Sequence, residues 1–410
     1  MSEKRLRVLF VDDDENILSG LRRLLRGMAK TWEMVFCDGG DKALALLAEQ
    51  SFDVVVSDMR MPSMDGAQLL ATIQQRHPGT IRVILSGYAD QTSVLRTVGP
   101  AHVYLAKPCT PETLIKAIAR PVALRKLLSA PGLRQALSGL STLPSAPDIF
   151  LALEKEIRSP QSSTASVAAV IAQDVAMTAA ILKLTNSAYF TLSARVTSPF
   201  QAVRLLGIET VESLVLQVGI FRGFTGNART APMIAALNEY SLKIAGLAEA
   251  IAEAEGESAQ MMKTAYCAGM LSCIGCLVLL EHHFTEYGAT MARVGSSISV
   301  HAAETAVLGA GHTHVGAYLL GLWGFESGLV EAVAHSCAPS NSPSRDFTPL
   351  TAVHAARALG PRFPLLPKGC RPPDMLDFGY LSECCLDRSV DRWRTLADAR
   401  GAAVGGGHHG

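Results

Sequence analysis

The spacing of hydrophobic residues divides the chain into two parts near residue 130. In the first part, short runs of β-branched residues alternate with segments in which apolar residues recur every three or four positions. The runs predict strands at Val8–Val11, Met34–Cys37, Val54–Ser57, Val83–Leu85 and Val103–Leu105. The periodic segments predict helices at Ile17–Arg26, Lys42–Gln50, Ala67–Arg76, Thr92–Val98 and Pro111–Leu128. Strands that alternate with helices indicate a parallel sheet covered on both faces.

The second part has helical periodicity and almost no strand signal. The pattern runs from Asp148 to about Cys337, after a linker rich in Pro, Gly and Ser. It predicts helices at Ile149–Ile157, Val167–Gln173, Met177–Ser187, Val203–Leu206, Val211–Phe221, Leu237–Glu253, Met261–Leu280 and His314–Trp323. Residues 341–410 begin polar and Pro-rich, and then carry weak helical patterns before a glycine-rich tail. We therefore expect an α/β domain followed by an all-α domain and a C-terminal extension.

Composition limits the classes of protein to which the chain can belong. It has 410 residues, with 37 Lys and Arg against 37 Asp and Glu, so its formal net charge is zero. This balance makes nucleic-acid binding an unfavoured function and argues against a basic membrane-surface protein, because both need excess positive charge. With 49% hydrophobic and 18% charged residues, the chain can bury large cores.

No secretory or membrane segment is expected. Met1–Arg7 is charged, and a strand-like run and an acidic cluster follow where a signal peptide would have a long apolar region. The longest uncharged run, Thr264–Leu280, is shorter than the ~20 residues that span a bilayer and predicts a buried core helix. Nine cysteines without framework spacing indicate reduced thiols in a cytoplasmic protein.

Polar residues follow four of the five predicted strands. They are Asp12, Asp13, Asp14, Asp58, Ser86 and Lys107. Any one of the acids, taken alone, is best explained as a solvated helix cap. Because parallel strands end at one edge of a sheet, however, we expect the whole set to converge there. Carboxylates that face one another need a cation, and a hard divalent ion such as Mg²⁺ suits their oxygen atoms. One carboxylate can then act as the nucleophile toward a phosphoryl group.

These residues resemble the receiver domain of a two-component response regulator. The matching motifs are Val11-Asp12-Asp13, Asp58 with Met61-Pro62 and Asp65-Gly66, Leu85-Ser86-Gly87-Tyr88, and Lys107-Pro108. The resemblance covers roughly Arg5–Leu128. It implies a flavodoxin-like fold, a five-stranded doubly wound parallel sheet, and a cognate histidine kinase as partner.

The resemblance also assigns roles to individual residues. Asp58 is expected to accept the phosphoryl group, which Lys107 and Ser86 contact. Mg²⁺ is expected to bind Asp12, Asp13, Asp58 and the backbone carbonyl of Arg60. Ser86 and Tyr104 match the pair that switches on phosphorylation, and the Lys107–Pro108 peptide is expected to be cis. The switch would bias the surface around helix four, strand five and helix five, and a phosphorylation-dependent homodimer through this surface is plausible. Gly99-Pro100 departs from the family pattern there.

The helical part resembles the HDOD domain, a relative of the HD phosphohydrolases that has generally lost their catalysis. The matching pieces are Leu143-Pro144 through Pro147, Ala172-Gln173-Asp174, Leu182–Ala188, Ala202–Gly207, Ala268–Leu271, His312–Ala317, Trp323-Gly324 and His335. The resemblance covers about Leu133–Pro339. We divide the chain into a receiver over residues 5–128, a linker over 129–142 that overlaps the start of an HDOD domain over 133–340, and a helical extension and flexible tail over 341–410.

Most metal-binding positions of the HD enzymes are altered here. Tyr240 stands in place of the first His, and Ser272-Cys273 replaces the His-Asp doublet, while only His312 and His335 are kept. Two imidazoles make a poor hydrolytic site, because three or more protein ligands are the norm. We therefore expect these positions to bind no metal and the protein not to be an enzyme, apart from phosphoryl transfer and autodephosphorylation by the receiver.

Cys273 and Cys276 form a C-x-x-C motif, which is typical of a redox pair or half a zinc site. The motif lies in an apolar helical run without the preceding strand of thioredoxin-like proteins, so we expect two buried thiols. The leading hypothesis is a cytoplasmic response regulator whose HDOD module signals by binding another protein. The alternatives are that this module binds a nucleotide second messenger or retains metal-dependent phosphodiesterase activity.

Overall fold

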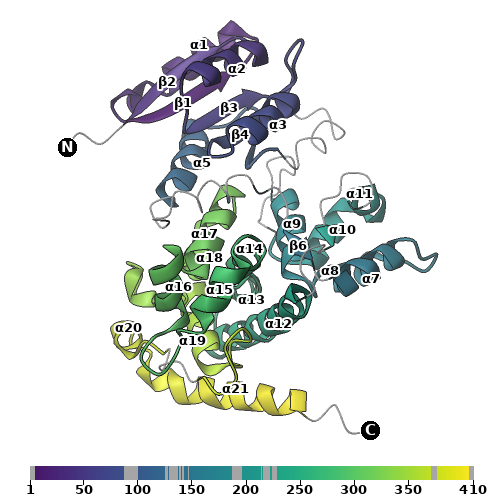
Figure 1. The fold of residues 1–410 in the computed structure, drawn as a ribbon, viewed down its shortest axis with the longest axis vertical. Coiled ribbons are helices and arrows are strands. Elements are labelled where there is room, and N and C mark those ends of the chain that lie inside the picture. Colours follow the sequence, from purple (N-terminus) through teal and green to yellow (C-terminus); the bar gives the residue numbers. More distant parts are fainter. Residues whose placement is uncertain are drawn as a thin grey trace.

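The protein is described by a computed structural model that defines residues 5–86, 100–124, 128, 137, 140, 143–145, 147–186, 196–213, 215, 222–223, 229–370 and 376–405. Figure 1 shows an α/β domain at one end of the long axis and a helical domain below it. The multidomain architecture predicted from the sequence is confirmed.

The α/β domain is built on a five-stranded parallel sheet. Its strands are β1 (Leu6–Val11), β2 (Trp32–Cys37), β3 (Val54–Asp58), β4 (Ile81–Ser86) and β5 (Val103–Ala106), in the order β2-β1-β3-β4-β5. The helices are α1 (Glu15–Leu24), α2 (Gly40–Glu49), α3 (Gly66–Arg76) and α5 (Pro111–Leu124). The helix predicted at Thr92–Val98 lies outside the described residues. Helix α5 contains Pro121 and continues through it to Leu124.

Alternate residues of the strands enter two separate apolar cores. Val8 and Phe10 of β1 pack with residues of α1 and α5, whereas Leu9 and Val11 pack with residues of α2 and α3. Burial on both faces explains why these strands are continuous β-branched runs without polar alternation. The two cores hold the sheet in place from both faces, so polar groups lie at its carboxyl edge.

The helical domain contains the elements expected from its periodicity and several more. Its long helix is α12 (Thr230–Ala254). The helices before it are α7 (Pro147–Ile157), α8 (Thr164–Ile171), α9 (Val175–Thr185), α10 (Pro199–Leu206) and α11 (Ile208–Ser213). Those after it are α13 (Ala259–Leu271), α14 (Ile274–His282), α15 (Phe284–Met291), α16 (Val300–Leu308), α17 (His312–Leu322) and α18 (Ser327–His335). A two-residue parallel pair, β6 (Pro144–Ser145) with β7 (Arg222–Gly223), lies near α7 and α9.

The single helix predicted over Met261–Leu280 is two helices. The backbone leaves the helical conformation at Cys273, and Ser272 Oγ donates a hydrogen bond of 2.8 Å to the carbonyl of Gly269. The break lets α14 turn against α17, where a Cβ on Gly275 would lie only 2.0 Å from the carbonyl oxygen of His312. Ala259–His282 is long and apolar enough to cross a membrane, but 89% of its most apolar window is buried inside the protein. Hydropathy alone therefore could not locate this break.

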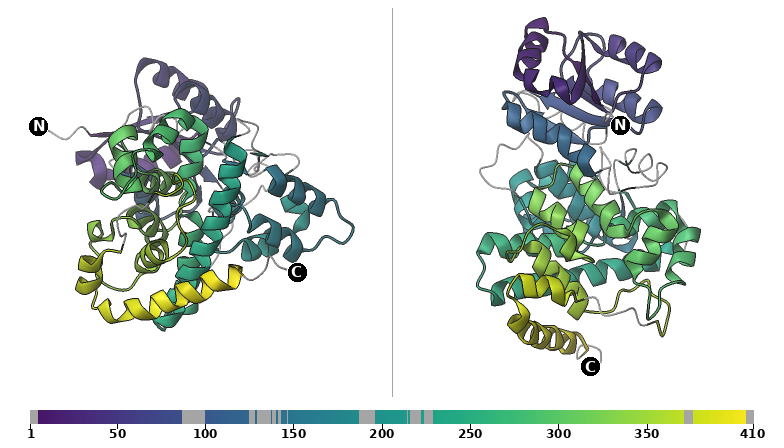
Figure 2. Two further views of the ribbon diagram at one scale, coloured as in Figure 1. Left: turned by 60° about the horizontal axis from the view of Figure 1, so that its bottom comes forward. Right: turned by 90° about the vertical axis from the view of Figure 1, so that its left-hand side faces the viewer.

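The C-terminal segment completes the helical domain. Helix α19 (Pro349–Leu359) packs against α12, α13 and α18, so it belongs to the core of the domain. After α20 (Phe378–Glu383), the last helix α21 (Val390–Gly405) crosses the end of the molecule farthest from the sheet, against α12 and α19 (Figure 2). Trp393 of α21 is fully buried there. Residues 406–410 of the predicted tail lie outside the described residues.

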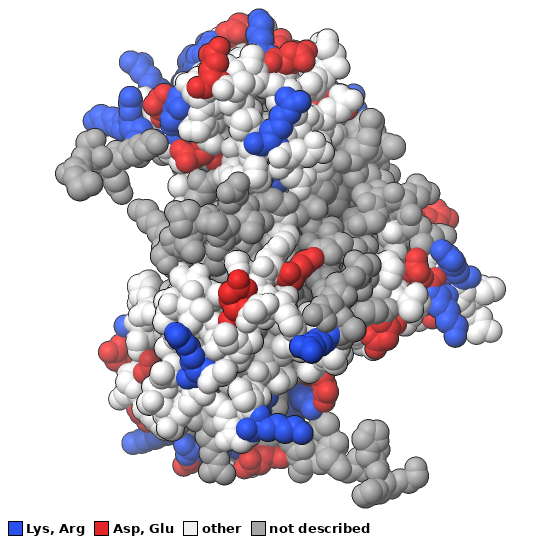
Figure 3. All heavy atoms as spheres, viewed as in Figure 1, with Lys and Arg blue, Asp and Glu red and all other residues white. Residues whose placement is uncertain are grey.

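The two domains meet through α5 and α17. Arg120 of α5 donates a hydrogen bond to the carbonyl of Phe325, and a Cβ on Gly321 of α17 would lie 2.0 Å from Leu124 Cδ1. Figure 1 shows the end of α5 directed toward α17. On the face seen in Figure 3, the described Lys and Arg side chains are interspersed with Asp and Glu, in line with the zero net charge.

Candidate functional site

The predicted acidic pocket forms at the carboxyl edge of the sheet. β1 and β3 are neighbours in register, with Val11 opposite Ser57, so the next residues along each strand, Asp12 and Asp58, lie side by side. Asp12 is only 2% exposed and Asp58 only 9% exposed. Two carboxylates this close and this buried repel one another, and the pocket therefore requires a cation.

Lys107 supplies one positive charge to this pocket. Its Nζ donates a hydrogen bond of 2.7 Å to Asp12 Oδ2 and a shorter one to Asp58 Oδ1. Burial lowers the pKa of Lys107, but the bonds to Asp12 and Asp58 outweigh it and raise the pKa above its usual value. The Lys107–Pro108 peptide is cis, as expected. Lys107 therefore stays charged between the two carboxylates.

The remaining acids of the cluster have different surroundings. Asp13 and Asp14 are exposed. Asp14 caps α1, because its side chain accepts a hydrogen bond of 2.8 Å from the backbone N–H of Asn16. Asp14 thus has the ordinary capping role, whereas Asp12 and Asp58 form the pocket. The backbone N–H of Arg60 donates to Asp58 Oδ2 at 2.6 Å, which fixes the second carboxylate oxygen.

The donor set of the pocket suits a hard divalent cation. Two carboxylates, those of Asp12 and Asp58, face one ammonium group, the exposed Asp13 follows Asp12 in the chain, and oxygen donors are the ligands that Mg²⁺ prefers. Among the described residues, no three His, Cys, Asp or Glu side chains form a ready-made metal site. In the receiver pocket, the acidic side chains do not form such a cluster because Lys107 lies between Asp12 and Asp58 and because Asp13 is exposed. A carbonyl and water molecules would complete the shell, as is usual for Mg²⁺.

The predicted switch residues lie on the two strands beside the pocket. Ser86 is the last residue of β4, and its carbonyl accepts a hydrogen bond of 2.8 Å from the backbone N–H of Lys107. Tyr104 of β5 is 9% exposed, so its ring is buried. Ser86 therefore lies beside Lys107 of the pocket, whereas Tyr104 packs in the apolar core on the α2 and α3 face of the sheet.

A buried arginine connects the sheet to the helical domain. Arg82 of β4 is fully buried, and burial lowers its pKa to about 10. Its Nη1 donates a hydrogen bond of 3.2 Å to the carbonyl of Thr80, and its Nη2 lies 2.8 Å from His102 Nε2. Tyr104 of β5 and Tyr318 of α17 lie within electrostatic range of the guanidinium. Lys183 of α9 is also near Arg82, and its Nζ lies 4.9 Å from the centre of the Trp323 ring. Arg82 is thus placed between the predicted switch and the helical domain.

The altered HD positions of the helical domain converge on Arg357, which we did not single out from the sequence. Arg357 of α19 is 5% exposed, and its Nη2 lies 2.8 Å from His312 Nε2. Its Nη1 donates toward Cys273 Sγ at 3.6 Å, and Tyr240 lines the same cavity. The available signal was a single charged residue in the apolar run of α19.

Glu304 of α16 is the second residue that the sequence analysis missed. It is fully buried and accepts hydrogen bonds from Tyr287 Oη at 2.8 Å and from the backbone N–H of His312 at 2.8 Å. His312 Nδ1 lies 2.7 Å from Glu304 Oε2. Burial raises the pKa of Glu304, but the contacts with His312 outweigh it and lower the pKa. A neutral His312 can donate through Nδ1 to Glu304 and accept from Arg357 at Nε2.

The other predicted positions of this centre lie around it in different ways. Ser272 and Cys273 form the break between α13 and α14, and a hydrogen bond with Cys276, together with the charge of Arg357, lowers the pKa of Cys273 to about 5. Burial raises the pKa of Cys276 well above its usual value. All three cysteines of this region, Cys267, Cys273 and Cys276, are buried free thiols, as predicted. His335 ends α18, and its Nδ1 is buried without a hydrogen-bond partner.

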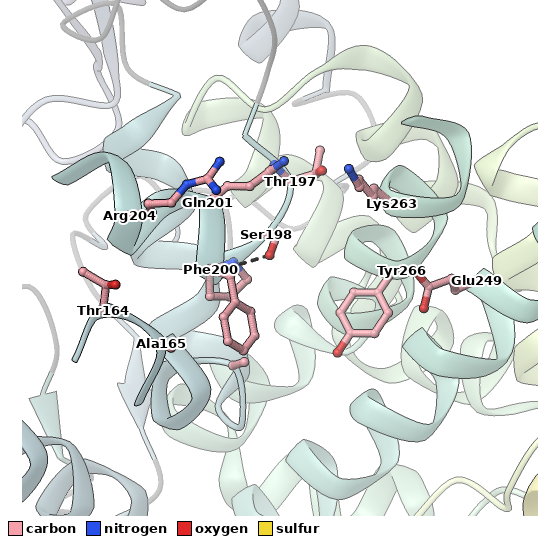
Figure 4. Close-up of a pocket in the computed structure, with 12 residues that line it drawn as sticks. Thr164, Ala165, Thr197, Ser198, Phe200, Gln201, Arg204, Glu249, Lys263 and Tyr266 are labelled. Carbon is pink, nitrogen blue, oxygen red and sulfur yellow. Dashed lines mark hydrogen bonds between the residues drawn. The ribbon is translucent and has the colours of Figure 1, made fainter. Parts of the chain in front are cut away.

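A separate groove of about 610 Å³ lies between α10 and the α12–α13 pair. Figure 4 shows Phe200 in the middle of this groove, with Arg204 on one side and Tyr266 on the other. Phe200 is 50% exposed, and Ser198 accepts a hydrogen bond of 3.2 Å from its backbone N–H. The groove thus presents one half-exposed aromatic ring beside polar and charged side chains.

The fold and the acidic pocket define a receiver-type α/β domain joined to an all-α output domain. The chain matches the family model of the response regulator receiver domain over residues 8–119 and that of the HDOD domain over residues 143–339. It is therefore a response regulator with a receiver domain and an HDOD domain.

Known relatives resemble parts of this chain. The hydrogenase transcriptional regulatory protein HoxA of Cupriavidus necator is 32% identical over 42% of this chain and 38% of its own length. The DNA-binding transcriptional regulator NtrC of Salmonella typhimurium is 35% identical over 28% of this chain and 24% of its own length. The chain thus spans less than two fifths of these relatives.

Two solved structures are also similar. The signal receiver domain of an HD domain-containing protein from Pseudomonas fluorescens is 34% identical and covers 30% of this chain and 94% of its own, with a TM-score of 0.27. The MmoQ response regulator from Methylococcus capsulatus is 21% identical and covers 62% of this chain and 98% of its own, with a TM-score of 0.43.

Proposed function

We propose that the protein is a cytoplasmic response regulator in which phosphorylation of Asp58 changes how the HDOD domain binds a partner protein. The donor of the phosphoryl group is the phosphohistidine of a cognate histidine kinase. A carboxylate oxygen of Asp58 attacks the phosphorus atom, the bond from phosphorus to the imidazole nitrogen breaks, and an acyl phosphate forms. The imidazole nitrogen leaves with the electron pair of the broken bond, and a proton on the other ring nitrogen makes the departing histidine neutral.

The residues around Asp58 favour this transfer. Lys107 contacts Asp58 directly and can bind an oxygen of the incoming phosphoryl group. The bond from the Arg60 N–H to Asp58 Oδ2 orients the carboxylate, which leaves Oδ1 toward Lys107. Asp12, Asp13, Asp58 and the carbonyl of Arg60 would hold Mg²⁺, which when bound supplies positive charge to the phosphoryl oxygens. Ser86, beside Lys107, is the hydroxyl proposed to contact the product.

The observation that carries the link to the output is the position of Arg82. It is fully buried, and both Tyr104 of the proposed switch and Tyr318 of α17 lie within electrostatic range of its guanidinium. A movement of Tyr104 would change the surroundings of a buried charge, and buried charges respond strongly to their neighbours. Helix α5, which belongs to the surface predicted to switch, contacts the helical domain through Arg120 and Phe325, so a homodimer through this surface would compete with the helical domain.

We propose that the HDOD domain is not an enzyme. The space around His312 Nε2 and Cys273 is taken by the guanidinium of Arg357, a cation that opposes binding of a second one. No described set of three ligands supports the phosphodiesterase alternative. The groove around Phe200 is instead the proposed contact for a partner protein.

Phosphorylation is tested by labelling with acetyl phosphate and Mg²⁺. The wild type is expected to incorporate phosphate and Asp58→Asn to incorporate none, while Asp14→Asn, at a cap outside the pocket, labels normally. Equal labelling of wild type and Asp58→Asn would refute the assignment. Hydrogen exchange of the full chain with and without beryllofluoride then tests the link, and we expect changed protection in both α5 and α17. Unchanged α17 would contradict it.

The output is tested by capturing proteins from native lysate on the intact chain. One bait carries beryllofluoride and Mg²⁺, and the other carries Asp58→Asn. We expect that one of the two baits retains a protein that the other does not retain. We also expect that the substitution Phe200→Asp in that bait abolishes the retention of this protein. Phe378→Asp serves as the matched control, because Phe378 is 48% exposed on α20, outside the groove. Identical captures in both states would contradict a phosphorylation-gated interaction.

A further inference from the structure

A cavity of about 600 Å³ opens beside the Arg357 centre. One wall is the N-terminus of α16, with Ser299 and His301, and the other is the end of α19 with the segment that follows it, from Arg357 to Phe363. Cavities of roughly 300–1,000 Å³ are typical of small-molecule sites. The cavity is separate from the acidic pocket of the receiver and from the groove around Phe200.

Arg357 brings an incompletely paired charge to this cavity. The whole residue is only 5% exposed, and its Nε atom is buried without a hydrogen-bond partner. Its two Nη atoms contact only the His312 imidazole and the thiols of Cys273 and Cys337. The acid of the network, Glu304, is engaged by His312 and Tyr287. None of the groups that contact the guanidinium is a carboxylate, and a phosphate is the anion whose geometry it matches.

The rest of the cavity also favours an anion. The N-terminus of the nine-residue helix α16 points a partial positive charge toward its lining residues Ser299 and His301. Arg362 adds a second cation, and Asp377 is the one acid among the lining residues. Asp377 already accepts hydrogen bonds from Ser340 Oγ at 2.6 Å and from the backbone N–H of Tyr380 at 3.0 Å. Two arginines against one carboxylate leave the lining with a net charge of +1.

We propose that this cavity binds a small phosphate-bearing molecule, with Arg357 as the buried cation that holds the phosphate. Binding would join α16 to α19 and would therefore stabilise the HDOD domain. The site does not depend on phosphorylation of Asp58, so the two proposals can fail separately. The competing partner for Arg357 is a thiolate of Cys273, and a protein that has satisfied Arg357 in this way would bind no phosphate.

The test is calorimetric titration of the full chain carrying Asp58→Asn, in EDTA, so that the receiver pocket is silent. The probes are AMP, inorganic phosphate and adenosine. We expect AMP to bind and adenosine not to bind. Arg357→Met and Ala358→Trp are each expected to weaken binding at least tenfold. Ala358→Trp fills the cavity from a half-buried position and keeps Arg357, so it remains informative if Arg357→Met does not fold.

Arg394→Met is the matched control, because Arg394 is exposed on α21 outside the cavity and should leave binding unchanged. Thermal unfolding of each variant verifies that it is folded. Inorganic phosphate that binds as tightly as AMP would support the site and assign it to free phosphate. No binding of either probe at millimolar concentration, or binding that Ala358→Trp leaves unchanged, would overturn the proposal.

Discussion

The two charged centres of this molecule are built in opposite ways. In the receiver, two carboxylates share one ammonium group at the open edge of a sheet, so negative charge is in excess. In the HDOD domain, a buried guanidinium is linked through His312 to a single buried carboxylate, and its Nε is unpaired. The first arrangement suits a cation and the second opposes one. The comparison teaches that the altered HD positions have become a different electrostatic site with a cation built into it.

The largest difference between the centres is expected in stability. Glu304→Gln removes the charge from the network of Tyr287, His312 and Arg357, and it is expected to lower the free energy of unfolding by about 3–5 kcal/mol, as for a broken buried pair. Asp13→Asn in the exposed part of the receiver pocket is expected to change it by less than about 0.5 kcal/mol. Urea unfolding of both variants measures this. Similar effects of the two substitutions would break the comparison.

The second prediction concerns Lys183 at the junction of the domains. Burial and then the charge of Arg82 lower the pKa of Lys183 from 10.5 to about 7. Between these values the unfolded chain binds more protons than the folded protein, so stability from this group rises with pH, by at most about 1.4 kcal/mol per pH unit. Below pH 7 both states are protonated and the slope disappears.

Lys183→Met is expected to remove this slope and to be more stable than wild type near pH 7. Urea unfolding at several pH values measures the slope in each protein. Lys243→Met, at a surface lysine paired with Glu239, is the control that should keep it. A slope that is the same in Lys183→Met and wild type would show that Lys183 is not the titrating group.

The smallest predicted effect is on the stability of two Gly→Ala variants. It distinguishes the contribution of the contact between the domains from that of helix propensity. Gly328→Ala in α18 meets no atom within 4 Å and is expected to stabilise the protein by about 0.5–1 kcal/mol. Gly321→Ala in α17 gains the same propensity but must displace Leu124 of α5. We expect Gly321→Ala to lose this gain and to speed hydrogen exchange in α5. Equal stabilisation by both substitutions would show that the domain contact is not tight.

The receiver pocket could be predicted almost completely from the chain. Asp58 and Ser86 end strands, and Asp12 and Lys107 directly follow strands. Because the strands of a parallel sheet end at one edge, local position fixes spatial position. The HDOD centre could not be predicted in this way. Its members come from α12, α14, α16, α17 and α19, and no periodicity states which faces of distant helices meet. Arg357 in particular lies in a segment expected to be only an extension.

The sequence by itself determined the two-domain architecture, the five strands and the place of the acidic pocket, because those depend on short-range pattern and on strand order. Only the tertiary structure decided the break at Ser272-Cys273, the inclusion of α19 in the core and the pairing of Glu304, His312 and Arg357. The physical reason is burial. Whether a buried charged group destabilises the protein or forms a binding site depends on the groups that replace its water, and these come from distant parts of the chain.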